Sequence, residues 1–218
     1  MSTRDRILDA SLQLFNQSGE RNVTTNHIAA HLGMSPGNLY YHFKNKQAII
    51  YQLFDRYEHR VMNVLTLPEG RAIETADKIR YLTQVFEGLW EYRFMHRDME
   101  HLLKADPQLH ERYRGFFRFC LRRIEEIFLA VDAAGIIAAS EQDCRDLALN
   151  TWIIVTSWFS FLHSNLLPAS DAEISEDMLR GGIYQVFSLE RPYLTEAHRD
   201  SVQELQRQFI PRPSWLGI

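Results

Sequence analysis

The sequence is poor in cysteine, glycine and proline. It has two cysteines, Cys120 and Cys144, and only ten glycines and seven prolines among 218 residues. Two cysteines within helical patterns do not make the disulfide framework of a small secreted domain, so we expect a reducing, cytoplasmic location. β-Branched runs are few, whereas Leu, Ala, Glu, Gln and Arg are plentiful, which favours helix over strand. We therefore predict an all-α protein.

Long apolar runs are also scarce. The first six residues, Met-Ser-Thr-Arg-Asp-Arg, contain no apolar core of a signal peptide. The longest apolar stretch, residues 152–162, is interrupted by Thr and Ser and is short for a membrane span. We therefore expect no membrane partner.

The net charge of −4 argues against a protein that is basic over its whole surface. Residues 1–46 hold five Lys or Arg and three Asp or Glu, so this segment carries +2 and the remainder carries −6. A modestly basic head on an acidic body is typical of a protein that reads nucleic acid. Eight charges can also take this distribution by chance, so the charge alone does not decide the function.

Residues 24–46 predict two short helices joined by a tight turn. Each helix is preceded by hydroxyl residues that can cap it, namely Thr24 and Thr25 for the first and Ser35 for the second. Gly33 lies between them and tolerates the left-handed backbone of a turn. Apolar residues recur at helical spacing and predict the inward faces: Ile28, Ala29, Leu32, Leu39 and Phe43. This is the pattern of a helix-turn-helix, whose second helix enters the major groove of DNA.

The same stretch contains an alternative pattern, because Gly33-x-Ser35-x-Gly37 matches the nucleophile elbow of serine hydrolases. That elbow requires a strand before the serine and a helix after it. The preceding residues have helical periodicity and leave no room for a sheet. An enzyme using Ser35 is therefore a remote alternative.

The string Gly-Met-Ser-Pro-Gly-Asn-Leu-Tyr-Tyr-His-Phe-Lys-Asn-Lys, residues 33–46, closely resembles the recognition-helix signature of the TetR family of transcriptional regulators. The resemblance is specific over residues 4–55 and architectural beyond them. It implies a helix-turn-helix DNA-binding domain of three helices at residues 1–48 and a larger helical domain for ligand binding and dimerisation at residues 49–218. It also implies a homodimeric repressor that a small hydrophobic molecule releases from an inverted-repeat operator in double-stranded DNA.

The resemblance carries DNA contacts onto nine positions: Thr25, Asn26, Ser35, Gly37, Asn38, Tyr40, Tyr41, His42 and Lys46. Asn38 is the best candidate for base readout, because Asn can pair bidentately with adenine, and Gly37 would permit close approach of the backbone. Lys46 is predicted to reach a phosphate. Asn26 departs from the Arg or Lys that family members often carry, and Tyr40 has the alternative of packing in the core.

Apolar periodicity predicts further helices outside the helix-turn-helix, over residues 3–17, 45–67, 72–94, 98–104, 106–134, 141–163, 175–189 and 195–209. Thr3 is predicted to cap the first of them. Ser140 and Asp143 resemble a capping box for the helix that starts at residue 141.

Residues 152–162 are apolar on nearly every side of their predicted helix, whereas a surface helix needs a single apolar stripe. We expect one face to line the interior and another to meet a second subunit. The resemblance pairs the helices at 141–163 and 175–190 with the four-helix bundle of the family's dimers. The predicted dimer contacts are Trp152, Trp158, Leu162, Tyr184 and Phe187.

The aromatic residues of the body predict an apolar pocket with a few polar groups, near residues 90, 116 and 155. Its candidate ligand-binding residues are Trp90, Arg93, Phe94, Tyr113, Phe116, Phe117, Thr151, Val155 and Phe159. The segment 90–100, followed by Asp106-Pro107, resembles a subgroup that includes regulators of polyhydroxyalkanoate metabolism, which implies an acyl, acyl-CoA or other hydrophobic effector. The alternative is a ligand-independent DNA-binding protein, in which residues 49–218 form a filled core that binds no ligand.

Neither a metal nor a cofactor is expected. His27 and His31 have a metal-compatible spacing, but the sequence offers no third ligand beside them. His96, Asp98 and His101 form a weaker cluster, which is more typical of a solvated helix face.

Overall fold

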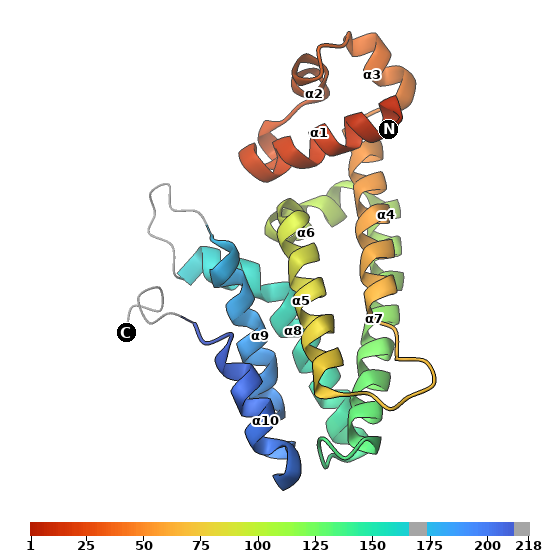
Figure 1. Ribbon diagram of the computed structural model, residues 1–218. Coiled ribbons are helices and arrows are strands. Elements are labelled where there is room, and N and C mark those ends of the chain that lie inside the picture. The colour runs from red at the N-terminus through yellow and green to blue at the C-terminus, as the bar shows by residue number, and fades with distance from the viewer. Residues whose placement is uncertain (166–173, 212–218) are drawn as a thin grey trace. The chain divides into compact units, whose positions relative to one another are not determined.

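The computed structural model describes residues 1–165 and 174–211 of the chain. Within these ranges the chain forms ten α-helices and two short 3₁₀-helices and no strand, so the predicted all-α class is confirmed (Figure 1). The helices are α1 (Thr3–Ser18), η1 (Glu20–Asn22), α2 (Thr25–His31), α3 (Pro36–His42), α4 (Lys46–Val64), α5 (Thr75–Glu91), α6 (Arg93–Ala105), α7 (Pro107–Ala133), α8 (Glu141–Asn165), α9 (Glu176–Glu190), η2 (Arg191–Tyr193) and α10 (Glu196–Arg207). Over the same ranges, no helix is both long and apolar enough to cross a membrane.

The chain packs as two units. The first comprises Met1–Val61 and Tyr92–Arg114, and the second comprises Met62–Glu91 and Gly115–Ile218. The boundary predicted after residue 48 lies inside the continuous helix α4, so the packing divides the chain later than the sequence suggested. The reason is that α4 contributes to the core of the first unit beyond that point, where Phe54 contacts Tyr113 at a ring-centroid distance of 6.1 Å.

The N-cap of helix α1 lies one residue earlier than predicted. It is Ser2, not Thr3: the Ser2 hydroxyl accepts a hydrogen bond from the Asp5 amide, and the Asp5 carboxylate accepts one from the Ser2 amide. This reciprocal capping box satisfies two backbone groups at the start of the helix. The predicted box of Ser140 and Asp143 is confirmed in the same form at α8.

The segment predicted as one helix over residues 72–94 is two helices in the structure. Helix α5 ends at Glu91, and Tyr92 has a non-helical backbone (φ −107°, ψ 30°) from which α6 starts. Phe94 therefore belongs to α6 in the first unit, where its ring lies 5.1 Å from that of Phe15 on α1. Apolar periodicity did not reveal this break, because it continues through Tyr92 without interruption.

Helix α9 lies at the centre of the second unit, between α5, α8 and α10. Gly182 lets α9 approach its neighbours closely: a Cβ atom there would lie 2.5 Å from the ring of Phe86 and 2.9 Å from that of Trp158. The Trp158 indole N–H also donates a hydrogen bond to the Met178 carbonyl, at 3.1 Å. A buried ion pair between Lys78 and Glu190 joins α5 to the end of α9.

This packing corrects part of the predicted dimer interface. Trp158, Leu162 and Phe187 are buried by the chain itself, because α8 and α9 cover each other's apolar sides. They are core residues of the second unit. Trp152 and Tyr184 are half-buried.

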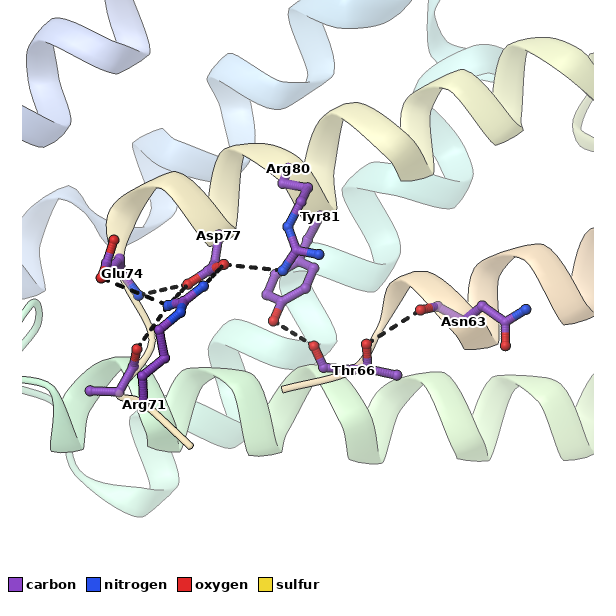
Figure 2. A network of polar contacts seen from close by, with 8 residues as sticks. Asn63, Thr66, Arg71, Glu74, Asp77, Arg80 and Tyr81 are labelled. Atoms are coloured by element: carbon purple, nitrogen blue, oxygen red, sulfur yellow. Dashed lines mark hydrogen bonds and ion pairs between the residues drawn. The ribbon is translucent and has the colours of Figure 1, made fainter. Parts of the chain in front are cut away.

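The loop between α4 and α5 is held by polar contacts (Figure 2). The Arg71 guanidinium points at the Asp77 carboxylate and donates two hydrogen bonds to it, at 2.6 and 2.8 Å. Arg80 donates another to Asp77 at 3.1 Å, and the Tyr81 hydroxyl donates to the Thr66 carbonyl at 2.6 Å. Hydrogen bonds from Arg71, from the Glu74 amide and from Arg80 hold the pKa of the buried Asp77 carboxyl well below its ordinary value, and those from Arg71 are the largest cause.

Candidate nucleic-acid interface

Helices α2 and α3 are fixed at their N-termini by the predicted caps. The Thr24 hydroxyl accepts the His27 amide at 3.2 Å, and His27 Nδ1 accepts the Thr24 amide at 3.3 Å. The Ser35 hydroxyl oxygen accepts the Asn38 amide at 3.2 Å, with Pro36 as the first helical residue. Gly33, at φ +63°, makes the turn between the two helices. The backbone of the helix-turn-helix is therefore preorganised.

Apolar residues fix the inward faces of these two helices. Ile28, Ala29, Leu39 and Phe43 are almost completely buried. Because they lie on one side of each helix, the residues between them must project outward. The orientation of the candidate interface follows from this burial.

The outward face carries aromatic, hydroxyl and amide groups. Tyr41 is 85% exposed and Tyr40 is 47% exposed, so the alternative in which Tyr40 packs in the core is wrong. The Tyr40 hydroxyl lies 3.0 Å from the Thr25 hydroxyl, which joins the start of α2 to α3. Asn26, Ser35, Gly37 and Asn38 are exposed beside them, and His42 is half-buried with its ring edge against Tyr41. All nine predicted positions are exposed or half-buried, and eight of them thus remain candidates for contact.

Lys46 is the exception, because its ammonium group already has partners in the protein. It donates to the carbonyl oxygens of Glu20 and Val23, both at 3.0 Å, and lies 2.7 Å from the Glu20 carboxylate. An ammonium has three N–H donors, and these three acceptors occupy them. The predicted phosphate contact of Lys46 does not fit this arrangement. These acceptors could not be predicted from residue types, since two of them are backbone carbonyls.

Two sequence models match the chain. The model described as bacterial regulatory proteins of the tetR family matches residues 7–53, and the model described as bacterial transcriptional repressor matches residues 56–202. A TetR-family transcriptional regulator from Marinobacter aquaeolei VT8 is 48% identical and superposes with a TM-score of 0.89, over 97% of this chain and 100% of that chain. The chain belongs to the TetR family of transcriptional regulators.

More distant relatives share parts of the sequence or only the fold. The regulator YvkB of Bacillus subtilis is 35% identical over 68 residues, which is 31% of this chain and 36% of that protein. The chain thus matches about a third of that relative's length. A transcriptional regulator from Saccharomonospora viridis, crystallised in complex with choline, is 16% identical with a TM-score of 0.63, over 85% of this chain and 95% of that chain. This last comparison supports the fold alone.

Membership of the TetR family settles the role of Ser35. TetR proteins are regulators and not enzymes, and Ser35 follows a helix and a turn where a hydrolase elbow would follow a strand. The Gly-x-Ser-x-Gly pattern is therefore the turn and cap of the recognition helix α3.

The nine predicted ligand-binding residues of this TetR regulator are divided between its two units. In the first unit, Phe94 and Tyr113 contact Phe15 and Phe54, while Arg93 is half-buried at the start of α6. In the second, Phe116 and Phe117 lie edge-on to Trp152, at 6.0 and 5.2 Å. The other members, also in the second unit, are Trp90, Thr151, Val155 and Phe159.

Thr151 differs from these aromatic neighbours. Its side chain is buried, and its hydroxyl has no hydrogen-bond partner among the described residues. A buried hydroxyl without a partner costs free energy. The Thr151 hydroxyl therefore has hydrogen-bonding capacity that the described residues do not use.

The possible metal clusters offer little. His27 and His31 are exposed, and His27 Nδ1 is already used in the cap of α2. Helix α4 carries a second group of candidate metal ligands, Asp55, Glu58 and His59, which was not predicted from the sequence. Their ligand atoms lie within 4.8 Å of one another. Arg112 pairs with both carboxylates of this group, so their charge is already compensated.

Proposed function

We propose that this TetR-family regulator is a homodimeric repressor that binds an inverted-repeat operator through α2 and α3. The observation that carries the proposal is the outward face of the helix-turn-helix, where the Tyr41 ring is 85% exposed on a helix fixed by a buried core. An exposed aromatic with a hydroxyl, beside other hydroxyl and amide groups, suits contacts with phosphates and base edges. Because its partner is genomic DNA, we place the protein in the cytoplasm.

The contacts divide by chemistry. Asn38 is proposed to read a base, because its amide can donate to and accept from the edge of adenine. Gly37, one residue earlier, leaves room for the backbone to approach the DNA. Tyr40, Tyr41 and Thr25 are proposed to donate to phosphates, which fix the register of the helix without reading sequence.

Three of the remaining positions take lesser roles. The Ser35 hydroxyl oxygen accepts the Asn38 amide, so its own hydrogen stays available for a phosphate. Asn26 is exposed and His42 is half-buried, and both are proposed as weaker contacts with the DNA backbone. Lys46 is left out of the proposed contacts because its donors are occupied.

In vitro selection from random duplexes tests DNA recognition. We expect the full chain to enrich an inverted repeat, because a two-fold symmetric dimer presents two recognition helices to two half-sites. Asn38→Ala should weaken binding to the selected duplex by about 1–3 kcal/mol and relax the preference at one position of each half-site. Enrichment of no motif would contradict the proposal.

A stripe on α8 supports the dimer. Leu149, Ile153, Ser157 and Phe161 follow one another at a spacing of four residues, and all are exposed in the single chain. This spacing places them on one helical face, and exposed apolar groups on one face are typical of an interface. Ile153→Glu should yield monomers in sedimentation velocity, whereas Ala197→Glu, an exposed position on α10, should leave a dimer. A wild-type monomer would contradict this part.

The unpartnered hydroxyl of Thr151 supports an effector site in the second unit. An apolar molecule with one hydrogen-bonding group would satisfy it, as would an acyl chain that ends in a carbonyl. We expect octanoyl-CoA or octanoate to raise the melting temperature of the protein and to release the selected duplex. We also expect Thr151→Val to reduce both effects. If acyl and other apolar probes leave melting and DNA binding unchanged, the ligand-independent alternative is favoured.

A further inference from the structure

The ammonium group of Lys46 fastens two connections of the helix-turn-helix to each other. Lys46 is the first residue of α4 and follows the recognition helix α3 by a short connection. Its acceptors, the carbonyls of Glu20 and Val23 and the Glu20 carboxylate, lie in the connection that leads from α1 into α2. The α2–α3 pair is thus held at its two ends by one side chain.

Glu20 is the other half of this contact. Its side chain is 5% exposed, and one carboxylate oxygen pairs with Lys46. Its second oxygen, Oε2, is buried without a hydrogen-bond partner among the described residues and lies 3.9 Å from His101 Nε2 on α6. Removing Lys46 would leave a buried carboxylate without compensation, and a buried charge that loses its partner is strongly unfavourable. The two residues should therefore act as one unit.

We propose that Lys46 and Glu20 are positioning residues, which hold α2 and α3 in the register that DNA recognition requires. The inference rests on the proposed function and concerns residues that need not touch the DNA. To bind a phosphate, the Lys46 ammonium would have to give up its hydrogen bonds to Glu20 and Val23. In the proposed arrangement Lys46 stays on those acceptors when DNA is bound.

The salt dependence of DNA binding distinguishes positioning from phosphate contact. A lysine that neutralises a phosphate contributes about 0.9 to the slope of log K against log salt. Lys46→Gln should therefore leave the slope of the wild type unchanged. It should nevertheless lower the ratio of affinities for the selected and random duplexes by roughly tenfold or more, the size expected when a base contact is displaced.

Matched variants complete the experiment. Glu20→Gln keeps Lys46 and should lower the same affinity ratio with an unchanged slope, and the double variant should be no worse than the poorer single variant. Lys44→Gln, at an exposed lysine two residues away, shows the effect of removing charge alone. Circular dichroism confirms that each variant is folded at the binding temperature, and Glu20→Gln carries the test if Lys46→Gln does not fold.

The outcomes separate this proposal from the proposed function. A slope that falls by about 0.9 per protomer in Lys46→Gln would overturn it, as would an unchanged affinity ratio in Glu20→Gln or additive effects in the double variant. A wild-type protein that prefers no duplex would instead overturn the proposed function, whatever these variants do.

Discussion

The hydroxyl oxygens of Thr25 and Tyr40 lie 3.0 Å apart. Thr25 is the first residue of α2, and Tyr40 lies on α3. The contact orients a half-exposed tyrosine beside the start of a neighbouring helix, so that two hydroxyl groups from different helices meet on the outward face. We propose that they bind one phosphate together.

Removing either hydroxyl should weaken DNA binding by a similar amount. Tyr40→Phe and Thr25→Val each remove one donor and should each cost about 1 kcal/mol of binding free energy, the usual net value of a hydrogen bond. Because the two groups act together, the double variant should lose less than the sum of the two losses. Fluorescence anisotropy with the selected duplex measures the cycle, and strictly additive losses would contradict a shared phosphate.

A methyl group at position 182 should destabilise the second unit. Gly182→Ala places a Cβ atom 2.5 Å from Phe86 and 2.9 Å from Trp158, so we expect a loss of about 1–3 kcal/mol in the free energy of unfolding, as for other overpacked cores. Gly115→Ala is the matched control, because it also lies within a helix but has open space around it. That change should stabilise by up to about 1 kcal/mol through helix propensity. Thermal denaturation followed by circular dichroism measures both, and a stabilised Gly182→Ala would show that the predicted clash is absent.

The buried His96 should make stability depend on pH. Burial lowers its pKa from 6.5 to about 4, and its Nε2 lies 3.1 Å from the Tyr57 hydroxyl. As the pH falls through this window, the unfolded chain binds a proton that the folded chain does not. The contribution of His96 to the free energy of unfolding is therefore fully present above pH 6.5. It decreases by about 3 kcal/mol as the pH falls toward 4 and below.

His96→Gln keeps a hydrogen-bonding side chain but cannot titrate. Urea denaturation at pH 7 and at pH 4.5 should show a smaller loss of stability on acidification for this variant than for the wild type. Equal losses in the two proteins would mean that His96 does not supply the pH dependence.

The loop contacts of Figure 2 predict a contrast between two acidic residues. Asp77→Asn weakens hydrogen bonds from Arg71 and Arg80 at a buried carboxylate and should cost about 2–3 kcal/mol of unfolding free energy. Glu74→Gln removes an exposed partner 3.9 Å from Arg71 and should cost no more than about 1 kcal/mol. Urea denaturation compares them, and equal costs would contradict the assigned importance of the buried contact.

Much of the helix-turn-helix could be predicted because its signals are local. Thr24, Gly33, Ser35 and Pro36 act on backbone groups within a few residues, and the spacing of Leu39 and Phe43 shows which face is buried. The cap of α1 was also readable, since Ser2 and Asp5 have the spacing of a capping box. The prediction chose Thr3 although no acid lies three residues beyond it.

Contacts between distant segments could not be read in this way. Lys46 binds carbonyls 26 and 23 residues earlier in the chain, and no residue type marks a carbonyl as an acceptor. Similarly, the apolar surplus of residues 152–162 indicated that something covers α8. It did not show that α9 of the same chain packs on α8, that Trp158 and Leu162 are buried, or that Ile153 is exposed.

Photo-crosslinking at position 41 tests most directly the central claim that Tyr41 contacts duplex DNA. A photoreactive phenylalanine analogue can be placed at position 41 on α3 or, as a control, at position 198 on α10, and each protein irradiated with the selected duplex. We predict a covalent protein–DNA adduct from position 41 and none from position 198. A duplex that binds both proteins but forms no adduct at position 41 would contradict the claim that this face of the helix-turn-helix contacts DNA.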